Sequence, residues 1–219
     1  MTRSSGARVM SVLGVLVFWV GVFVAGGLVN GYSAREDYIS VLAARGSPVA
    51  VLVISALLAN AVAHLATAGA VLAGWGARLL AGFLAAAAVA LVAVAVFRQS
   101  CPAGLPRCGL ANSSAADWVD VVHGVSVGVY ELFTLAAMLT LTIGAFRRNS
   151  APPRWLGWVS LAFAAGSVAL GVQSVGDHSG MWQRLWLANN LVWLLLVAWT
   201  ATVRERAICN SGGIGAIAA

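Results

Sequence analysis

Residues Leu79–Phe97 read LLAGFLAAAAVALVAVAVF, a stretch without a single charged or hydrogen-bonding side chain. A helix rises by about 1.5 Å per residue, so a helix of this length spans most of a hydrocarbon core that is about 30 Å thick. A membrane strand would instead alternate apolar and polar residues over about ten positions. The stretch therefore predicts a transmembrane α-helix.

The same pattern recurs along the chain. Five more apolar stretches are long enough to cross a membrane: Val9–Val29, Val49–Ala73, Val121–Phe146, Trp155–Val172 and Leu185–Val203. Arg3 and Arg8 precede the first one, as in a signal peptide, but its apolar run is longer than the usual run of about 7–15 residues, so we expect a retained helix. The prediction is an all-α bundle of six transmembrane helices in a single domain over residues 1–203, followed by a short flexible tail over 204–219.

Composition excludes several classes of protein. Of the 219 residues, 61% are hydrophobic and 9% are charged, whereas a soluble domain has about 25% charged residues. This excludes a water-soluble enzyme, a disordered chain and a small secreted protein packed by disulfides. We expect a multi-pass protein of the inner (cytoplasmic) membrane of a cell, with membrane lipids rather than nucleic acid as the partner of its positive charge. Its oligomeric state is left open.

The basic residues predict the orientation of the chain. All 13 are Arg, and with cytoplasmic N- and C-termini eight of them fall inside and five outside, as the positive-inside rule requires. Cys101 and Cys108 then bracket an outer loop, CPAGLPRC, where an oxidising exterior favours a disulfide. Two free thiols are the alternative, and a metal pair is disfavoured because the loop holds no other Cys or His.

Ionisable residues inside a bilayer are functional hypotheses until a structural partner is found. At 100° per residue, one stripe of the fourth helix carries Asp120, His123, Tyr130, Glu131 and Thr134. Asp120 and His123 are three residues apart and can form a hydrogen bond. Glu131 lies about 16 Å deeper, near the midplane, where a lone carboxyl should be largely neutral and able to donate a proton. Glu131, Asp120 and His123 are the candidate catalytic residues.

A structural role for Glu131 is the alternative. A hydrogen bond from its carboxyl group to another helix would hold the bundle together without any catalysis. The candidate partners are Asn60, His64, Asn189 and Asn190.

Polar residues of the outer loops and helix ends form a second set of candidates. The candidate substrate-binding residues are Arg35, Asp37, Tyr130, Asp177, His178, Trp182, Arg184 and Asn190. An Arg side chain can hold a phosphate or carboxylate through two parallel hydrogen bonds. The alternative is a network of mutual salt bridges that closes the loops over the bundle.

No cofactor or metal is predicted. His64 lies about 24 Å below the outer surface, whereas His123 and His178 lie near that surface, so one ion cannot bind all three. A smaller site of His123, His178, Asp120 and Asp177 stays open as an alternative.

Several short motifs resemble family 998 of the domains of unknown function, which are bacterial six-helix membrane proteins. They are Tyr32–Ser33, Asp37–Leu42, Arg45–Pro48, Asp117–Gly124 and Trp182–Arg184. The resemblance extends from about residue 10 to residue 203 and implies a six-helix bundle, but little about activity.

A weaker resemblance is to small integral-membrane terpene cyclases. It is carried by Tyr130–Phe133 and by Asn189–Asn190, although the chain has one helix fewer than the seven usual in that family. It implies that a carboxylic acid protonates an epoxide or alkene of a prenylated substrate. The favoured function is thus an intramembrane enzyme that acts on a lipid-like or isoprenoid substrate. A proton-coupled transporter and a non-catalytic accessory protein are the alternatives.

Overall fold

The computed structural model describes residues 3–100, 117–147 and 151–215. Over these ranges the chain forms helices and no strand: α1 Arg3–Leu28, α2 Ile39–Leu42, α3 Ala50–Trp75, α4 Arg78–Val96, α5 Trp118–Phe146, α6 Arg154–Gln173 and α7 Ser179–Gly215. Six of these helices, all but α2, are long and apolar enough to cross a membrane. The six predicted spans are therefore confirmed, and the chain is a multi-pass membrane protein.

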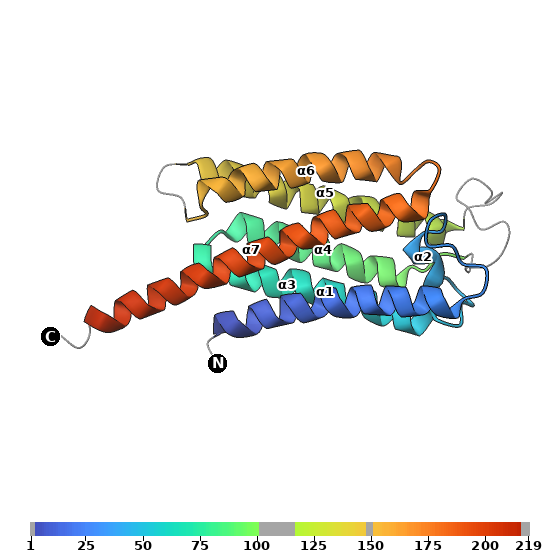
Figure 1. The fold of residues 1–219 in the computed structure, drawn as a ribbon, viewed down its shortest axis with the longest axis horizontal. Helices are drawn as coiled ribbons and strands as arrows, with labels where there is room; N and C mark the ends of the chain where they lie inside the picture. Colours follow the sequence, from blue (N-terminus) through green and yellow to red (C-terminus); the bar gives the residue numbers. More distant parts are fainter. Residues whose placement is uncertain (1–2, 101–116, 148–150, 216–219) are drawn as a thin grey trace.

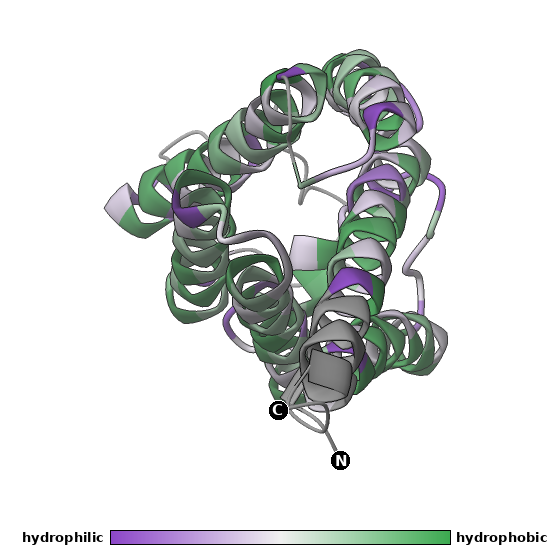
Figure 2. Ribbon diagram, turned by 90° about the vertical axis from the view of Figure 1, so that its left-hand side faces the viewer, coloured by the Kyte–Doolittle hydropathy of each residue, from purple (hydrophilic) through white to green (hydrophobic). Residues whose placement is uncertain are grey.

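The long helices lie side by side, with α2 at one end of the bundle and both chain termini at the other (Figure 1). We call these the α2 end and the termini end. Helices α3 to α7 pack in chain order into a ring that α7 closes against α3, and α1 packs outside the ring on α3 and α7 (Figure 2). Five helices therefore surround the centre of the bundle.

Small residues allow the helices to approach closely. A Cβ atom on Gly21 of α1 would lie only 2.8 Å from the Cβ of Ala56 on α3. A Cβ on Gly74 of α3 would overlap the backbone of Ala201 on α7. Close backbone contact of this kind favours helix association in membranes, where the lipid removes most of the hydrophobic driving force.

Two tryptophans join α7 to α6. The indole N–H of Trp186 donates to Ser167 Oγ over 3.0 Å, and that of Trp193 donates to Ser160 Oγ over 2.9 Å. The two Ser residues are seven positions apart on α6, and the two Trp residues are seven positions apart on α7. Seven residues is close to two helical turns, so the same contact occurs twice between these antiparallel helices. Trp193 is completely buried.

Helix α7 runs to Gly215 and so extends over most of residues 204–219, whose flexibility stays a prediction. Helix α2 was not predicted, because four residues are too few for a recognisable span. All four residues of α2 are buried, so this short helix lies between the long helices and closes that end of the bundle.

Candidate functional site

Glu131 occupies the middle of α5, thirteen residues after Trp118 and fifteen before Phe146. This confirms that its carboxyl group lies near the midpoint of the fourth span, as predicted. The side chain is partly buried, on the side of α5 that faces α6 and α7.

Four side chains bind one another around this carboxyl group, and we call them the carboxyl cluster: Glu131, Ser167, Trp186 and Asn190. Ser167 Oγ lies 2.6 Å from Glu131 Oε1, and Asn190 Nδ2 donates to Glu131 Oε2 over 3.0 Å. Ser167 Oγ also lies 2.7 Å from Asn190 Oδ1 and accepts the Trp186 indole N–H. Asn190 was among the partners proposed from the sequence, whereas Ser167 and Trp186 were not.

The number of hydrogens available for hydrogen bonds in this cluster bears on the protonation state of Glu131. The Ser167 hydroxyl has one hydrogen and three polar neighbours. The Trp186 N–H can only donate, whereas Asn190 Oδ1 and an ionised Glu131 oxygen can only accept, so the single hydroxyl hydrogen serves one of these two contacts. If it goes to Asn190, the contact between Ser167 and Glu131 needs a hydrogen on the carboxyl oxygen; if it goes to Glu131, the 2.7 Å contact with Asn190 has none.

The same result follows if the Asn190 amide is turned by 180°, an orientation that must be assigned from the network. Its oxygen then faces Glu131 Oε2 across 3.0 Å, and that contact also needs a carboxyl hydrogen. Asn190 Oδ1 also accepts the side-chain N–H of Asn189 over 3.3 Å, which favours the first orientation. With Glu131 ionised, every polar group of the cluster still has a partner, but one short contact lacks a hydrogen, and a proton on Glu131 supplies it.

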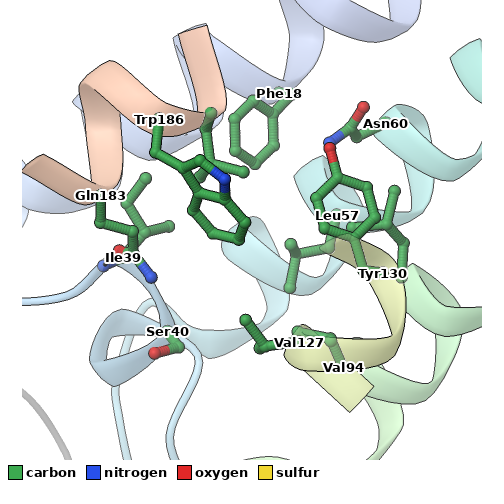
Figure 3. Close-up of a pocket in the computed structure, with 12 residues that line it drawn as sticks. Phe18, Ile39, Ser40, Leu57, Asn60, Val94, Val127, Tyr130, Gln183 and Trp186 are labelled. Carbon is green, nitrogen blue, oxygen red and sulfur yellow. Dashed lines mark hydrogen bonds between the residues drawn. The ribbon is translucent and has the colours of Figure 1, made fainter. Parts of the chain in front are cut away.

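A small cavity of about 40 Å³ lies beside the cluster at the centre of the bundle (Figure 3), and we call it the central cavity. By volume it has room for about three water molecules. Every helix except α6 contributes to its walls, which are Phe18, Ile39, Ser40, Leu57, Asn60, Leu91, Val94, Val127, Tyr130, Gln183, Trp186 and Leu187. Helix α2 covers the end of the cavity through Ile39 and Ser40 (Figure 3).

Two polar groups on this wall lack hydrogen bonds. Asn60 has no exposed surface and Tyr130 is 2% exposed, yet within the described part of the chain neither the Asn60 amide nor the Tyr130 hydroxyl forms a hydrogen bond of normal geometry. Thr134 and Asn190 are polar neighbours of the Tyr130 hydroxyl. Both residues line the cavity, and in the view of Figure 3 they lie on the same side of it. A buried polar group without a partner costs about 1–3 kcal/mol, so this pair needs an explanation.

Trp186 separates the central cavity from the carboxyl cluster. Its ring lines the cavity, and its indole N–H bonds to Ser167 in the cluster. The ring of Tyr130 meets it edge-on at a centroid distance of 6.0 Å and meets the buried His64 at 5.6 Å. Tyr130 therefore belongs to the cavity wall, while its neighbour Glu131 belongs to the cluster.

The predicted pair of Asp120 and His123 is not formed among the contacts of the described residues. Asp120 accepts the backbone N–H and the hydroxyl of Ser100, over 2.8 and 2.5 Å. His123 is buried, and its Nδ1 lies 2.8 Å from the carbonyl oxygen of Phe97. Both residues therefore hold the start of α5 to the chain that follows α4, and along the helix axis Asp120 lies about 16 Å and His123 about 12 Å from Glu131.

The loop residues at the α2 end bind mainly one another. His178 Nδ1 lies 2.8 Å from Glu36 Oε1, and its Nε2 lies 2.8 Å from the guanidinium group of Arg35. Arg45 forms an ion pair with Asp117 over 3.0 Å. This is the mutual network that the sequence offered as the alternative to an anion clamp.

Arg184 ties the first loop to α7. Its Nη1 donates to the carbonyl oxygens of Asp37 and Gly180 over 3.1 and 2.7 Å, and its Nη2 donates to the Tyr32 hydroxyl. Burial raises the pKa of Tyr32, so this hydroxyl keeps its proton. The Asp37 carboxylate accepts the backbone N–H of Ser33 over 2.7 Å.

The remaining predicted residues are dispersed. Asp177 is exposed in the connection between α6 and α7, and Trp182 is half-buried in the first turns of α7. No three His, Cys, Asp or Glu side chains within the described ranges come together in a way that could hold a metal ion. Cys101 and Cys108 lie outside the described residues.

Sequence comparison assigns the chain to a family. No curated protein and no solved structure shows significant similarity to it. One family profile, described as a protein of unknown function (DUF998), matches residues 12–200, which is most of the chain and includes all six spans in whole or in large part. With its six-helix bundle, the chain belongs to the DUF998 family.

Proposed function

We propose that the protein is an intramembrane enzyme that uses Glu131 as an acid on a lipid-like or isoprenoid substrate taken from the bilayer. One observation carries the proposal: both short contacts of the Ser167 hydroxyl in the carboxyl cluster have a hydrogen only when Glu131 holds a proton. A neutral acid at the centre of a membrane protein is a proton donor in surroundings with little competing water.

The chemistry that fits is protonation of an alkene or epoxide. The proton passes from a Glu131 oxygen to the substrate, where a carbocation develops, and loss of a proton from the cation returns one hydrogen to the carboxylate. The reaction is an isomerisation or cyclisation and needs no oxidant, reductant or co-reactant. The ring faces of Tyr130 and Trp186 next to the cavity would stabilise positive charge.

The cluster also suits the ionised form that follows proton transfer. Ser167 O–H and Asn190 N–H can then both donate to the carboxylate, because the Ser167 hydrogen is free to turn towards it. The proposal leaves Asp120 and His123 out of the proton transfer, since they bind Ser100 and Phe97.

The test compares lipids and small metabolites from membranes that contain wild type, Glu131→Gln, Thr142→Val or no protein. Thr142 is a matched control because it is a buried polar residue of the same helix, bonded to Gly157 O on α6 over 3.2 Å. A species that changes with wild type and Thr142→Val but not with Glu131→Gln would support the proposal. Identical profiles at equal expression would refute it, and proton-coupled uptake that depends on Glu131 would then indicate a carrier.

A further inference from the structure

We infer that Asn60 and Tyr130 form a binding site for the uncharged polar end, most simply a hydroxyl group, of an otherwise apolar ligand in the central cavity. The inference is independent of the proposed function, because Glu131 is not among the described residues that line the central cavity. The binding site itself follows from the two buried polar groups without partners.

The other polar groups of the cavity wall are already bonded. Gln183 Oε1 accepts the backbone N–H of Ile39 over 2.7 Å. Ser40 Oγ donates to Gln99 Oε1 over 3.2 Å. The unsatisfied hydrogen-bonding capacity is therefore concentrated at Asn60 and Tyr130, which lie on the same side of the cavity in the view of Figure 3.

Charge excludes an ionic head group. None of the twelve described residues that line the cavity is an Asp, Glu, Lys or Arg. Two Arg side chains at the α2 end are engaged elsewhere: Arg184 binds Asp37 O and Gly180 O, and Arg45 pairs with Asp117. A phosphate or diphosphate buried here would have no counter-charge, at a cost of several kcal/mol.

Hydrogen-bond capacity favours an alcohol. The Asn60 amide offers donors and an acceptor, and the Tyr130 hydroxyl offers one of each. A ligand hydroxyl can accept from one of the two groups and donate to the other. A ligand carbonyl can only accept, which would leave Asn60 Oδ1 without a donor.

Size and shape favour a head group attached to an apolar body. A cavity of about 40 Å³ holds a hydroxyl and a few carbon atoms in this conformation. The walls that lead away from Asn60 are apolar or aromatic, among them Leu57, Val127 and Trp186 (Figure 3). The body of the ligand would follow these walls towards α2.

The experiment measures thermal unfolding of the purified full-length protein in detergent with three probes. These are the isoprenoid alcohol farnesol, the hydrocarbon farnesene and the anion farnesyl diphosphate. The variants are wild type, Asn60→Leu, Tyr130→Phe, Glu131→Gln and the control Thr142→Val. Farnesol should raise the unfolding temperature of wild type, Glu131→Gln and Thr142→Val, and the other two probes should have less effect.

Asn60→Leu and Tyr130→Phe should each weaken farnesol binding at least tenfold. Without ligand they should unfold at the same temperature as wild type or higher, because each removes a buried group that lacks a partner. A loss of ligand-free stability like that of Thr142→Val would indicate a structural role instead. Equal shifts by farnesene or larger shifts by the diphosphate would overturn the inference, as would no shift by farnesol, which would leave water as the partner of both groups.

These results separate the inference from the proposed function. Farnesol binding to Asn60 and Tyr130 together with an unchanged lipid profile in Glu131→Gln would refute the acid role of Glu131 and keep the binding site. A lipid product that depends on Glu131 but not on Asn60 or Tyr130, with no shift by farnesol, would support the acid role of Glu131 and refute the binding site.

Discussion

Trp186 donates its indole N–H to the hydroxyl of Ser167 over 3.0 Å, and its ring forms part of the wall of the central cavity. One side chain thus connects the place where a ligand would bind with the cluster that holds the acidic proton. Because the indole can only donate, it occupies a lone pair of the Ser167 oxygen and leaves the hydroxyl hydrogen for Asn190 or Glu131. With a neutral Glu131, the hydroxyl can donate to Asn190 and accept the carboxyl hydrogen.

The first prediction concerns this hydrogen bond. Trp186→Phe keeps an aromatic ring in the cavity wall but removes the N–H that donates to Ser167. The Ser167 oxygen, which accepts the Glu131 proton, is then no longer held in one position. Trp193→Phe is the matched control, because it removes the equivalent bond to Ser160 two turns away. In both variants the free energy of unfolding should fall by about 0.6–1.5 kcal/mol, which is what one interhelical hydrogen bond contributes.

Only Trp186→Phe should reduce the Glu131-dependent lipid change, by about tenfold or more. The measurements are thermal unfolding in detergent and the lipid comparison of expressing membranes. Equal losses of lipid product in the two variants would mean that α6–α7 packing, and not the orientation of Ser167, limits activity.

The second prediction separates the chemistry of Glu131 from its structural contribution. In Glu131→Gln the amide N–H replaces the carboxyl O–H as donor to Ser167, and the amide oxygen accepts from Asn190, so no bond is lost. The free energy of unfolding should stay within about 1 kcal/mol of wild type, while Glu131→Ala should lose about 1–3 kcal/mol because Ser167 and Asn190 lose a partner. Both should lack activity. A Gln variant as unstable as the Ala variant would show that the folded protein needs the ionised carboxylate.

The third prediction addresses the proton directly. At pH 7 the infrared spectrum of wild type should contain the C=O stretch of a protonated carboxylic acid, and Glu131→Gln should lack it. A C=O band that is present in wild type and absent from Glu131→Gln reports Glu131 itself, whatever the other six acidic residues contribute to both spectra. A spectrum with no protonated acid in wild type would contradict the hydrogen count and remove the main support for Glu131 as a proton donor.

The fourth prediction tests the packing that encloses the cavity. A Cβ on Gly74 would overlap the backbone of Ala201, so Gly74→Ala should push α3 away from α7 and cost about 1–3 kcal/mol. Gly69→Ala on the same helix has nothing within 4 Å of the new Cβ and should be neutral, or stabilising by up to about 1 kcal/mol. Thermal unfolding of both variants is the measurement. Similar effects at the two positions would show that α3 and α7 separate more easily than their contact implies.

The positions of the spans could be predicted from the sequence because the length of an uninterrupted apolar run can be compared directly with the thickness of the bilayer, whatever the helix packs against. The depth of Glu131 followed from the same arithmetic. Its partner Ser167 could not be predicted, because a Ser in a membrane helix can equally bond to its own backbone. The available signal was the shared spacing of seven residues between Ser160 and Ser167 on one helix and between Trp186 and Trp193 on the next.

The pairing of Asp120 with His123 was predicted from helix periodicity, which places two side chains on one face but says nothing about competitors from other segments. Ser100 and Phe97 take their hydrogen bonds in the folded chain. Asn60 was proposed only as a partner of Glu131, and its place on the cavity wall depends on how five other helices pack around α3. Such long-range contacts carry no local pattern in the sequence.

The last prediction concerns Arg184, which the sequence offered as a holder of anions. Its hydrogen bonds to Asp37 O, Gly180 O and Tyr32 make it an anchor for the loop that leads into α2. Arg184→Ala should therefore expose residues 30–38 to amide hydrogen exchange. Arg35→Ala is the control, and it should have little effect because the Arg35 side chain is 64% exposed and its ion pair with Glu36 is worth less than about 1 kcal/mol.

The protection of residues 30–38 in wild type should also be independent of pH across the neutral range. Burial raises the pKa of Tyr32 above its ordinary value of 10.0, so the folded state favours the protonated phenol. A group of this kind contributes its full stabilisation below the unfolded pKa and loses it only as the pH rises through the folded pKa. Exchange protection should therefore hold from pH 6 to about pH 9 and decline only above about pH 10. Loss of protection within the neutral range would contradict the assignment of this loop to the contact between Tyr32 and Arg184.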